Sequence, residues 1–209
     1  MKLKKYRAFY WANIISVLAA LIIGSFSFFI GKNDFFLLLN KDLGFLGDIF
    51  FKYVTYLGDG VLWAFFVIGV IFFNKKKLPL SIVAIVVSTL IIHYVKGHLC
   101  ESVSRPLDAM PNLISIIHTI SGVKVHLAGS FPSGHSTQAF TMYLLLCILL
   151  NKNWLVYVGF FLALLVGYSR VYQAQHFPVD VAGGIFVAVI TAWISLFIQN
   201  KFEKKFISQ

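Results

Sequence analysis

The feature that most constrains this chain is a series of long apolar stretches separated by short polar segments. Six such stretches run over residues 9–30, 54–73, 78–95, 134–150, 154–168 and 181–199. A helix of about 20 apolar residues matches the hydrocarbon thickness of a bilayer, and it pairs its own backbone polar groups there. The sequence therefore predicts an all-α integral membrane bundle of six transmembrane helices.

Composition agrees with a membrane location. Of the 209 residues, 59% are hydrophobic and only 12% are charged, whereas soluble domains have about 25% charged residues. The length suits a single six-span domain over residues 1–209. Residues 31–52 mix acidic side chains with phenylalanines, which favours an amphipathic segment lying in the membrane interface. A plain connecting loop is the alternative for that segment.

The distribution of basic residues predicts an orientation. With both termini cytoplasmic, eleven of the 18 basic residues fall on the inner face, opposed there only by Glu203, as the positive-inside rule requires. The net charge of +10 is then explained by anionic lipid, and nucleic acid is not expected as a partner. This pattern is typical of a bacterial inner (cytoplasmic) membrane protein. The oligomeric state is left open.

A cluster of polar residues interrupts the apolar pattern between the last two stretches. Arg170, His176 and Asp180 lie within twelve residues there, and such residues at a membrane edge usually have a function. Pro178 is suited to open a helix, with Asp180 in its first turn. We expect Asp180 to contact one ring nitrogen of His176, fix its tautomer and leave the other nitrogen as nucleophile or base.

Further polar residues fall on the same outer side of the predicted topology. These are Lys96, Arg105 and the turn Pro132-Ser133-Gly134-His135. Arginine forks match phosphate oxygens, and the backbone N–H groups at a helix start favour an anion. The sequence therefore predicts a site for a phosphate-like oxyanion. With His135 and His176 present, that site has the groups for a two-step phosphoryl transfer.

No metal or cofactor is expected, because carboxylates and histidines show no metal-ligand spacing along the chain. Cys100 and Cys147 are interpreted as two unpaired thiols. The four other histidines are interpreted as packing or interface residues; they are His93, His98, His118 and His126. Asp59, flanked by glycines, is interpreted as a helix-capping residue, with contact to the site as the alternative.

The three motifs together resemble a known family. They read Lys96-x8-Arg105-Pro106, Pro132-Ser133-Gly134-His135 and Ser169-Arg170-x5-His176-x3-Asp180. This set resembles the signature of the type 2 phosphatidic acid phosphatase (PAP2) family, the membrane relatives of vanadium haloperoxidases, over about residues 90–185. The lysine and the Arg-Pro pair are eight residues apart, whereas six is usual in the family.

The resemblance implies a role for each motif residue. His176 would be the nucleophile that forms a phosphohistidine, Asp180 would orient it, and His135 would be the general acid. The phosphate oxygens would be held by five residues: Lys96, Arg105, Ser133, Gly134 and Arg170.

The resemblance predicts a metal-independent phosphatase that acts on a lipid phosphate in the outer leaflet. Undecaprenyl diphosphate, phosphatidylglycerol phosphate, phosphatidic acid and lipid A phosphates are all candidate substrates. A lipid phosphotransferase that uses the same site is one alternative. A non-enzymatic protein that binds or transports phosphorylated lipids is the other.

Overall fold

The computed structural model describes residues 5–207, with side chains up to residue 204. This part of the chain is helical and contains no β-strand. The longer helices are α2 (Arg7–Phe29), α5 (Val61–Asn74), α6 (Leu78–Tyr94), α8 (Gly134–Leu150), α9 (Asn153–Tyr172) and α10 (Pro178–Ile207). The shorter elements are α3 (Lys32–Leu39), α4 (Gly44–Val54), η1 (Thr55–Gly58), η2 (Lys75–Lys77), η3 (Val95–Leu99), α7 (Pro106–Ala109) and η4 (Pro111–Ile116). The prediction of an all-α fold is confirmed.

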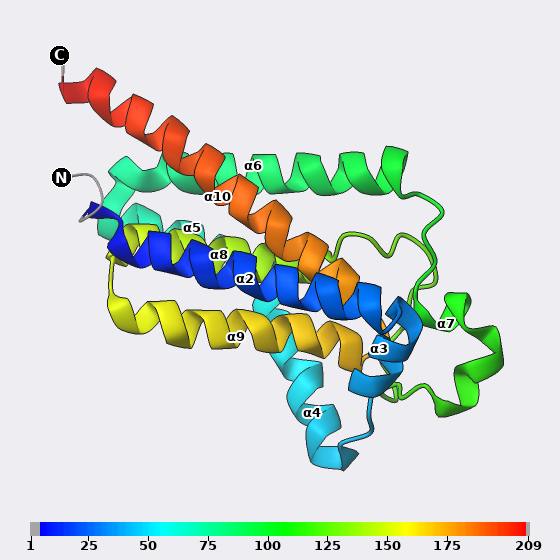
Figure 1. Cartoon of the computed structure of the whole chain (residues 1–209). Coiled ribbons are helices and arrows are strands. Elements are labelled where there is room, and N and C mark those ends of the chain that lie inside the picture. The colour runs from blue at the N-terminus through cyan, green and yellow to red at the C-terminus, as the bar shows by residue number, and fades with distance from the viewer. Residues whose placement is uncertain (1–4, 208–209) are drawn as a thin grey trace.

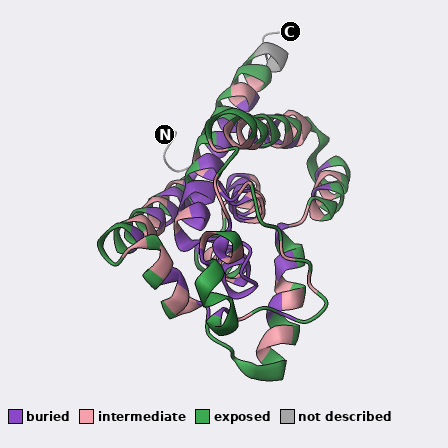
Figure 2. Ribbon diagram, turned by 90° about the vertical axis from the view of Figure 1, so that its right-hand side faces the viewer, coloured by how far each residue is buried: buried purple, intermediate pink, exposed green. Residues whose placement is uncertain are grey.

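The long helices run side by side, with both termini at one end and α3 and α7 at the other (Figure 1). α8 is the central helix, and it packs against α10, α9, α2 and α6. Viewed from the end opposite the termini, buried ribbon gathers in the middle of the bundle and exposed ribbon at its edge (Figure 2). The connections at this end bring together the last turns of α6 and α9 and the first turns of α8 and α10.

Within the described residues, four helical stretches are long and apolar enough to cross a membrane, namely 7–29, 61–99, 153–172 and 178–204. The stretch 61–99 contains both α5 and α6, which the lysine turn η2 joins, and α8 is a further, shorter apolar helix. This arrangement is consistent with six spans. The central α8 is only 17 residues long, about 25 Å, and it is largely enclosed by the other helices.

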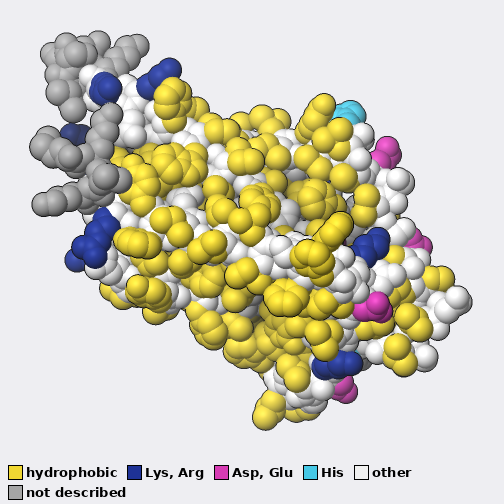
Figure 3. All heavy atoms as spheres, viewed as in Figure 1, with side chains coloured by type: hydrophobic (Ala, Val, Ile, Leu, Met, Phe, Trp, Pro, Cys, Tyr) yellow, Lys and Arg dark blue, Asp and Glu magenta, His cyan; other side chains and the backbone are white. Residues whose placement is uncertain are grey.

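The surface has the pattern of a membrane protein. Hydrophobic side chains cover the middle of the face seen in Figure 3. Lysines and arginines lie at both ends of this face, and the acidic residues seen in it lie at the end opposite the termini. Large apolar side chains such as Phe28 and Phe73 are more than four-fifths exposed. In water such a band would be costly, whereas lipid solvates it. The protein is an integral membrane protein.

Several predicted boundaries differ from the structure. The second span was expected to begin at residue 54, but α5 begins at Val61, because η1 and the extended backbone of Asp59 interrupt the helix. α9 continues four residues beyond residue 168, to Tyr172, so that Arg170 is in its last turn. The segment 31–52, which was expected to lie in the membrane interface or to form a loop, contains two short helices, α3 and α4.

Contacts at the end with the termini hold the chain ends together. Glu203 of α10 binds Lys77 at 2.6 Å and Lys5 at 3.3 Å. Lys2 and Lys4, which contribute to the predicted orientation, lie outside the described residues, as does the side chain of Lys205.

Candidate active site

A tight turn between α9 and α10 positions His176. The backbone N–H groups of Gln175 and His176 both donate to the carbonyl of Arg170, and Ala174 has a positive φ of 53°. This left-handed residue reverses the chain after α9 and points His176 into the protein, where it is 2% exposed.

Asp180 connects the starts of two helices to the histidine. Its Oδ2 accepts hydrogen bonds from the N–H of Phe177 at 2.9 Å and from the hydroxyl of Ser130. The bond to Phe177 is the reciprocal half of a capping box at the start of α10. The backbone carbonyl of Asp180 accepts from Ser133 N–H at 3.0 Å. One residue therefore fixes the first turns of both α8 and α10.

His176 faces Asp180 through Nδ1, which lies 3.4 Å from Oδ2. The contact is longer than a good hydrogen bond, and Nδ1 has no aligned partner among the described residues. Burial lowers the pKa of His176 far below its ordinary value, Arg105 and Arg170 lower it further, and Asp180 opposes them. The imidazole is therefore neutral at neutral pH, with Nε2 directed away from Asp180.

The start of α8 presents hydrogen-bond donors. Ser133 is its N-cap, and the Ser133 hydroxyl oxygen accepts from the N–H and the hydroxyl of Ser136. Its own N–H is already bonded to Asp180, and Pro132 has none. The backbone N–H groups that remain without a partner among the described residues are those of Gly134 and His135. They are the donors at the positive end of the helix dipole.

Lys96 and Arg105 meet at one backbone carbonyl. Lys96 Nζ donates to Gly129 O at 2.8 Å, and one Arg105 nitrogen lies 3.4 Å from the same oxygen. Arg105 also donates to Ala128 O and to Gln175, through both the backbone and the side-chain oxygen. The eight-residue spacing from Lys96 therefore does not remove the lysine from the cluster. The π-helical turn η3 and the following bends accommodate the longer connection.

Arg170 completes a group of three cations. Its guanidinium donates to Thr55 Oγ1 at 2.7 Å and to Gln173 Oε1 at 3.4 Å, and its buried Nε has no partner among the described residues. Lys96, Arg105 and Arg170 all act electrostatically on His135, which lies half-buried at the start of α8.

None of these three cations forms an ion pair with a carboxylate in the described part of the chain. Buried positive charges that are not compensated are costly, and they are stabilised when an anion joins them. The cluster therefore has the properties of an oxyanion site.

Several residues of this environment were missed by the sequence analysis. Thr55 and Gln173 hold Arg170, Gln175 holds Arg105, and Ser130 binds Asp180. The Gln-x-Gln pattern just before His176 was a usable signal. Thr55 had none, because it lies 115 positions before Arg170.

The prediction that Asp59 caps a helix is wrong. Its side chain accepts a hydrogen bond from the N–H of Gly60, the first residue after it, and it caps no helix in the usual geometry.

These features define a class: an all-helical integral membrane protein with two histidines in a buried cationic site at one membrane face. The chain belongs to the PAP2 superfamily, whose family model matches residues 78–204. The resemblance found in the sequence motifs is thereby confirmed.

Individual relatives agree with this membership. The chain is 32% identical over 123 residues to the bacitracin transport permease protein BcrC of Bacillus licheniformis, covering 57% of this chain and 54% of that protein. It is 37% identical over 82 residues to the undecaprenyl-diphosphatase BcrC of Bacillus subtilis, covering 38% of this chain and 40% of that protein. These alignments span about half or less of each relative's own length.

The fold also matches a solved structure. The crystal structure of Aquifex aeolicus LpxE superposes with a TM-score of 0.65 at 32% identity, over 77% of this chain and 92% of that chain. The likeness therefore extends beyond the three motifs to most of the bundle.

Proposed function

We propose that this protein is a metal-independent lipid phosphate phosphatase, formed by residues 1–209 as one membrane domain. The observation that carries the proposal is the group of three cations without carboxylate partners around two histidines, one of which is buried, neutral and faced by an aspartate. Binding an anion needs only the cations. The second histidine and the paired aspartate are explained by chemistry at phosphorus.

In the proposed complex the phosphate oxygens are held from several sides. Lys96, Arg105 and Arg170 supply charge, with the arginine forks making paired hydrogen bonds. Gly134 and His135 donate their backbone N–H groups. The Ser133 hydroxyl, whose oxygen already accepts from Ser136, donates its own proton.

The first step is attack by Nε2 of His176 on phosphorus. The N–P bond forms, and the bond from phosphorus to the leaving oxygen breaks. His135, which takes up a proton once the bound phosphate anion balances the three cations, gives that proton to the leaving oxygen. Asp180, 3.4 Å from Nδ1, keeps the proton of the ring on Nδ1 and stabilises the positive charge that develops. The three cations and the helix start balance the charge on the equatorial oxygens.

The second step releases phosphate. Water attacks the phosphohistidine and passes a proton to His135, which returns to its starting state. The N–P bond breaks and inorganic phosphate leaves. No atom of this cycle requires a metal.

Undecaprenyl diphosphate is the substrate that we propose first. The support is the similarity to an undecaprenyl-diphosphatase and a buried site at the edge of a membrane bundle. The leaving group would be the lipid monophosphate. Phosphatidylglycerol phosphate, phosphatidic acid and lipid A phosphates are the other members of the test panel. We further propose that the site faces the outer side of a bacterial inner membrane, with both termini cytoplasmic.

The test is phosphate release by detergent-purified protein from these four lipids in EDTA, with His176→Asn alongside. We expect release to persist in EDTA and to fall by at least about a thousandfold in the variant, as for other nucleophiles. A ³²P-labelled substrate should leave an acid-labile label on the wild-type protein and none on His176→Asn. A variant that keeps more than about a tenth of the rate would contradict the mechanism.

Transfer to another lipid is distinguished by the fate of the label. A phosphotransferase would move it to an acceptor lipid without release of inorganic phosphate.

A binding or transport protein is the second candidate function, and the similarity to a protein named as a transport permease favours testing it. Such a protein would bind the lipid with equal affinity as wild type and as His176→Asn, and neither form would release phosphate.

A further inference from the structure

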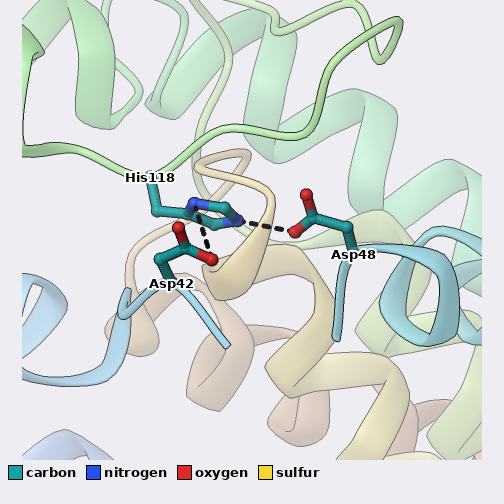
Figure 4. Close-up of side chains that lie close together, drawn as sticks. All are labelled: Asp42, Asp48 and His118. Carbon is teal, nitrogen blue, oxygen red and sulfur yellow. Dashed lines mark hydrogen bonds and ion pairs between the residues drawn. The ribbon is translucent and has the colours of Figure 1, made fainter. Parts of the chain in front are cut away.

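A second cluster of polar residues lies outside the oxyanion site. His118, just after η4, lies between Asp42, in the connection from α3 to α4, and Asp48 of α4 (Figure 4). Its Nε2 is 2.9 Å from Asp48 Oδ1, and its Nδ1 is 3.8 Å from Asp42 Oδ1. One ligand atom from each residue lies within 4.8 Å of the others. The spacing along the chain concealed this cluster, because His118 is 70 positions from Asp48.

The hydrogen bonds decide which ring nitrogen carries the proton. Asp48 Oδ1 accepts from the Tyr172 hydroxyl at 2.8 Å and faces His118 Nε2. A lone pair on Nε2 would be repelled by that carboxylate, so Nε2 is the donor. With the proton on Nε2, the lone pair of the uncharged ring is on Nδ1, the nitrogen that lies 3.8 Å from Asp42 Oδ1.

A ring-nitrogen lone pair and a carboxylate oxygen this close together repel each other unless a positive charge lies between them. The described residues give neither Asp42 nor Asp48 an ion pair with lysine or arginine. A proton on Nδ1 could supply this charge, but a hydrogen bond to Asp42 would then be about 2.7–3.2 Å long. The observed distance from Nδ1 to Asp42 Oδ1 is 3.8 Å. Two ligands of a tetrahedral Zn²⁺ ion, each about 2.1 Å from it, lie about 3.4 Å apart. A small movement of the exposed Asp42 side chain accommodates such an ion.

We propose that His118 Nδ1 and the carboxylate of Asp42 bind a divalent transition-metal ion of the Zn²⁺ type, while Asp48 accepts the proton of Nε2 and orients the ring, as carboxylates behind metal-binding histidines do. An imidazole with a carboxylate favours zinc over Ca²⁺ and Mg²⁺, which take oxygen ligands. Tyr172 is the supporting residue, since its hydroxyl orients Asp48 and accepts from the backbone N–H of Leu43 at 3.3 Å.

The position of the cluster indicates a structural role. Asn40 of the same connection donates to the backbone carbonyls of His118, Val171 and Tyr172, and Gln173 donates to Phe51 O of α4. The ion would connect the segment that contains His118 with the connection from α3 to α4. Through the hydrogen bond of Asp48 to Tyr172, it would also stabilise the end of α9, four residues before His176. It would stabilise the surroundings of the oxyanion site without contact with the substrate phosphate.

The experiment measures Zn²⁺ binding by the purified full-length protein, through competition with a chromophoric chelator, and the visible absorption of bound Co²⁺. His118→Gln and Asp42→Asn are the test variants. His93→Gln is the matched control, because the hydrogen-bond contact of that exposed histidine, at Thr89 O, lies within its own helix. We expect one ion per wild-type chain and per control chain, and affinity at least about tenfold lower in both test variants.

Thermal unfolding gives a second readout. Zn²⁺ should raise the melting temperature of the wild type and the control and leave that of His118→Gln unchanged. The proposal is overturned if wild type and His118→Gln bind Zn²⁺ equally, or if neither binds it. It is also overturned if only pH, and no metal, changes the difference in melting temperature between them. Phosphate release measured well below the melting temperature is independent of this result, so the phosphatase proposal is tested separately.

Discussion

Arg170 is the residue at which folding and chemistry are most closely joined. It is 7% exposed, its backbone carbonyl shapes the turn that positions His176, and its side chain contacts Thr55 and Gln173. These contacts fix the plane of the guanidinium before any anion binds. A preorganised fork loses less entropy when it binds phosphate than a flexible ammonium does.

Replacement of Arg170 by lysine tests this argument. The change keeps the charge but removes the planar fork, so we expect phosphate release to fall by about ten- to a hundredfold, as for the loss of hydrogen bonds to a charged group. The measurement is steady-state phosphate release. Arg7→Lys, exposed at the opposite end of the bundle, is the control and should keep the wild-type rate.

Ser130 is a positioning residue that acts through Asp180. Its hydroxyl donates to the same oxygen that faces His176, so Ser130→Ala frees that carboxylate to move. We expect kcat to fall about tenfold while KM stays near the wild-type value, because Ser130 does not touch the phosphate. Ser130→Thr should restore most of the loss by supplying the hydroxyl again. A fall in thermal stability with unchanged kcat would contradict this role.

At the scale of elements, the site depends on how closely α10 approaches α8. Gly184 of α10 permits this approach: a Cβ there would lie 2.7 Å from Ser133 O and 3.1 Å from Thr137 N. Both atoms are backbone atoms in the first turn of α8, which cannot give way without moving the helix start. The oxyanion donors of Gly134 and His135 belong to the same turn.

We expect Gly184→Ala to destabilise the protein by about 1–3 kcal/mol, the usual cost of overpacking, and to lower phosphate release. Gly69→Ala in α5 is the matched control, since a Cβ there meets no atom within 4 Å. The control replaces glycine by a better helix former and should be neutral or slightly stabilising. Thermal unfolding of both variants in one detergent checks the comparison, and equal melting temperatures would contradict it.

At the scale of the whole molecule, the apolar band and the charge distribution determine how the bundle lies in a membrane. The Glu203 contacts hold both ends of the chain at one face, and the oxyanion site lies at the other (Figure 1). Basic residues at cytoplasmic loops are favoured during insertion. The predicted orientation therefore places the site outside.

A labelling experiment tests this orientation. On a Cys100→Ser background, with Cys147 buried, cysteines placed at the exposed positions Ser121 and Asn153 report opposite faces. An impermeant thiol reagent should label Ser121→Cys in intact cells and Asn153→Cys only after the membrane is opened. The reverse pattern would overturn the orientation.

The sequence by itself determined the fold class, the order of the helices and the motif residues. The position of a membrane span depends on the length of its own apolar stretch, which can be read directly from the sequence. α8, for example, begins and ends at the residues that the sequence predicted. The family could be inferred from the three motifs because each motif is a short stretch of residues with fixed spacing.

Only the tertiary structure decided how distant residues meet. Four features join positions that are far apart in the chain: the contact of Thr55 with Arg170, the contact of Ser130 with Asp180, the close approach of α10 to α8 at Gly184, and the cluster around His118. It also decided which donors of the Pro132–His135 turn are available, because Asp180 occupies the N–H of Ser133. A local sequence pattern predicts the secondary structure of its own segment, whereas these contacts depend on how whole helices pack against one another.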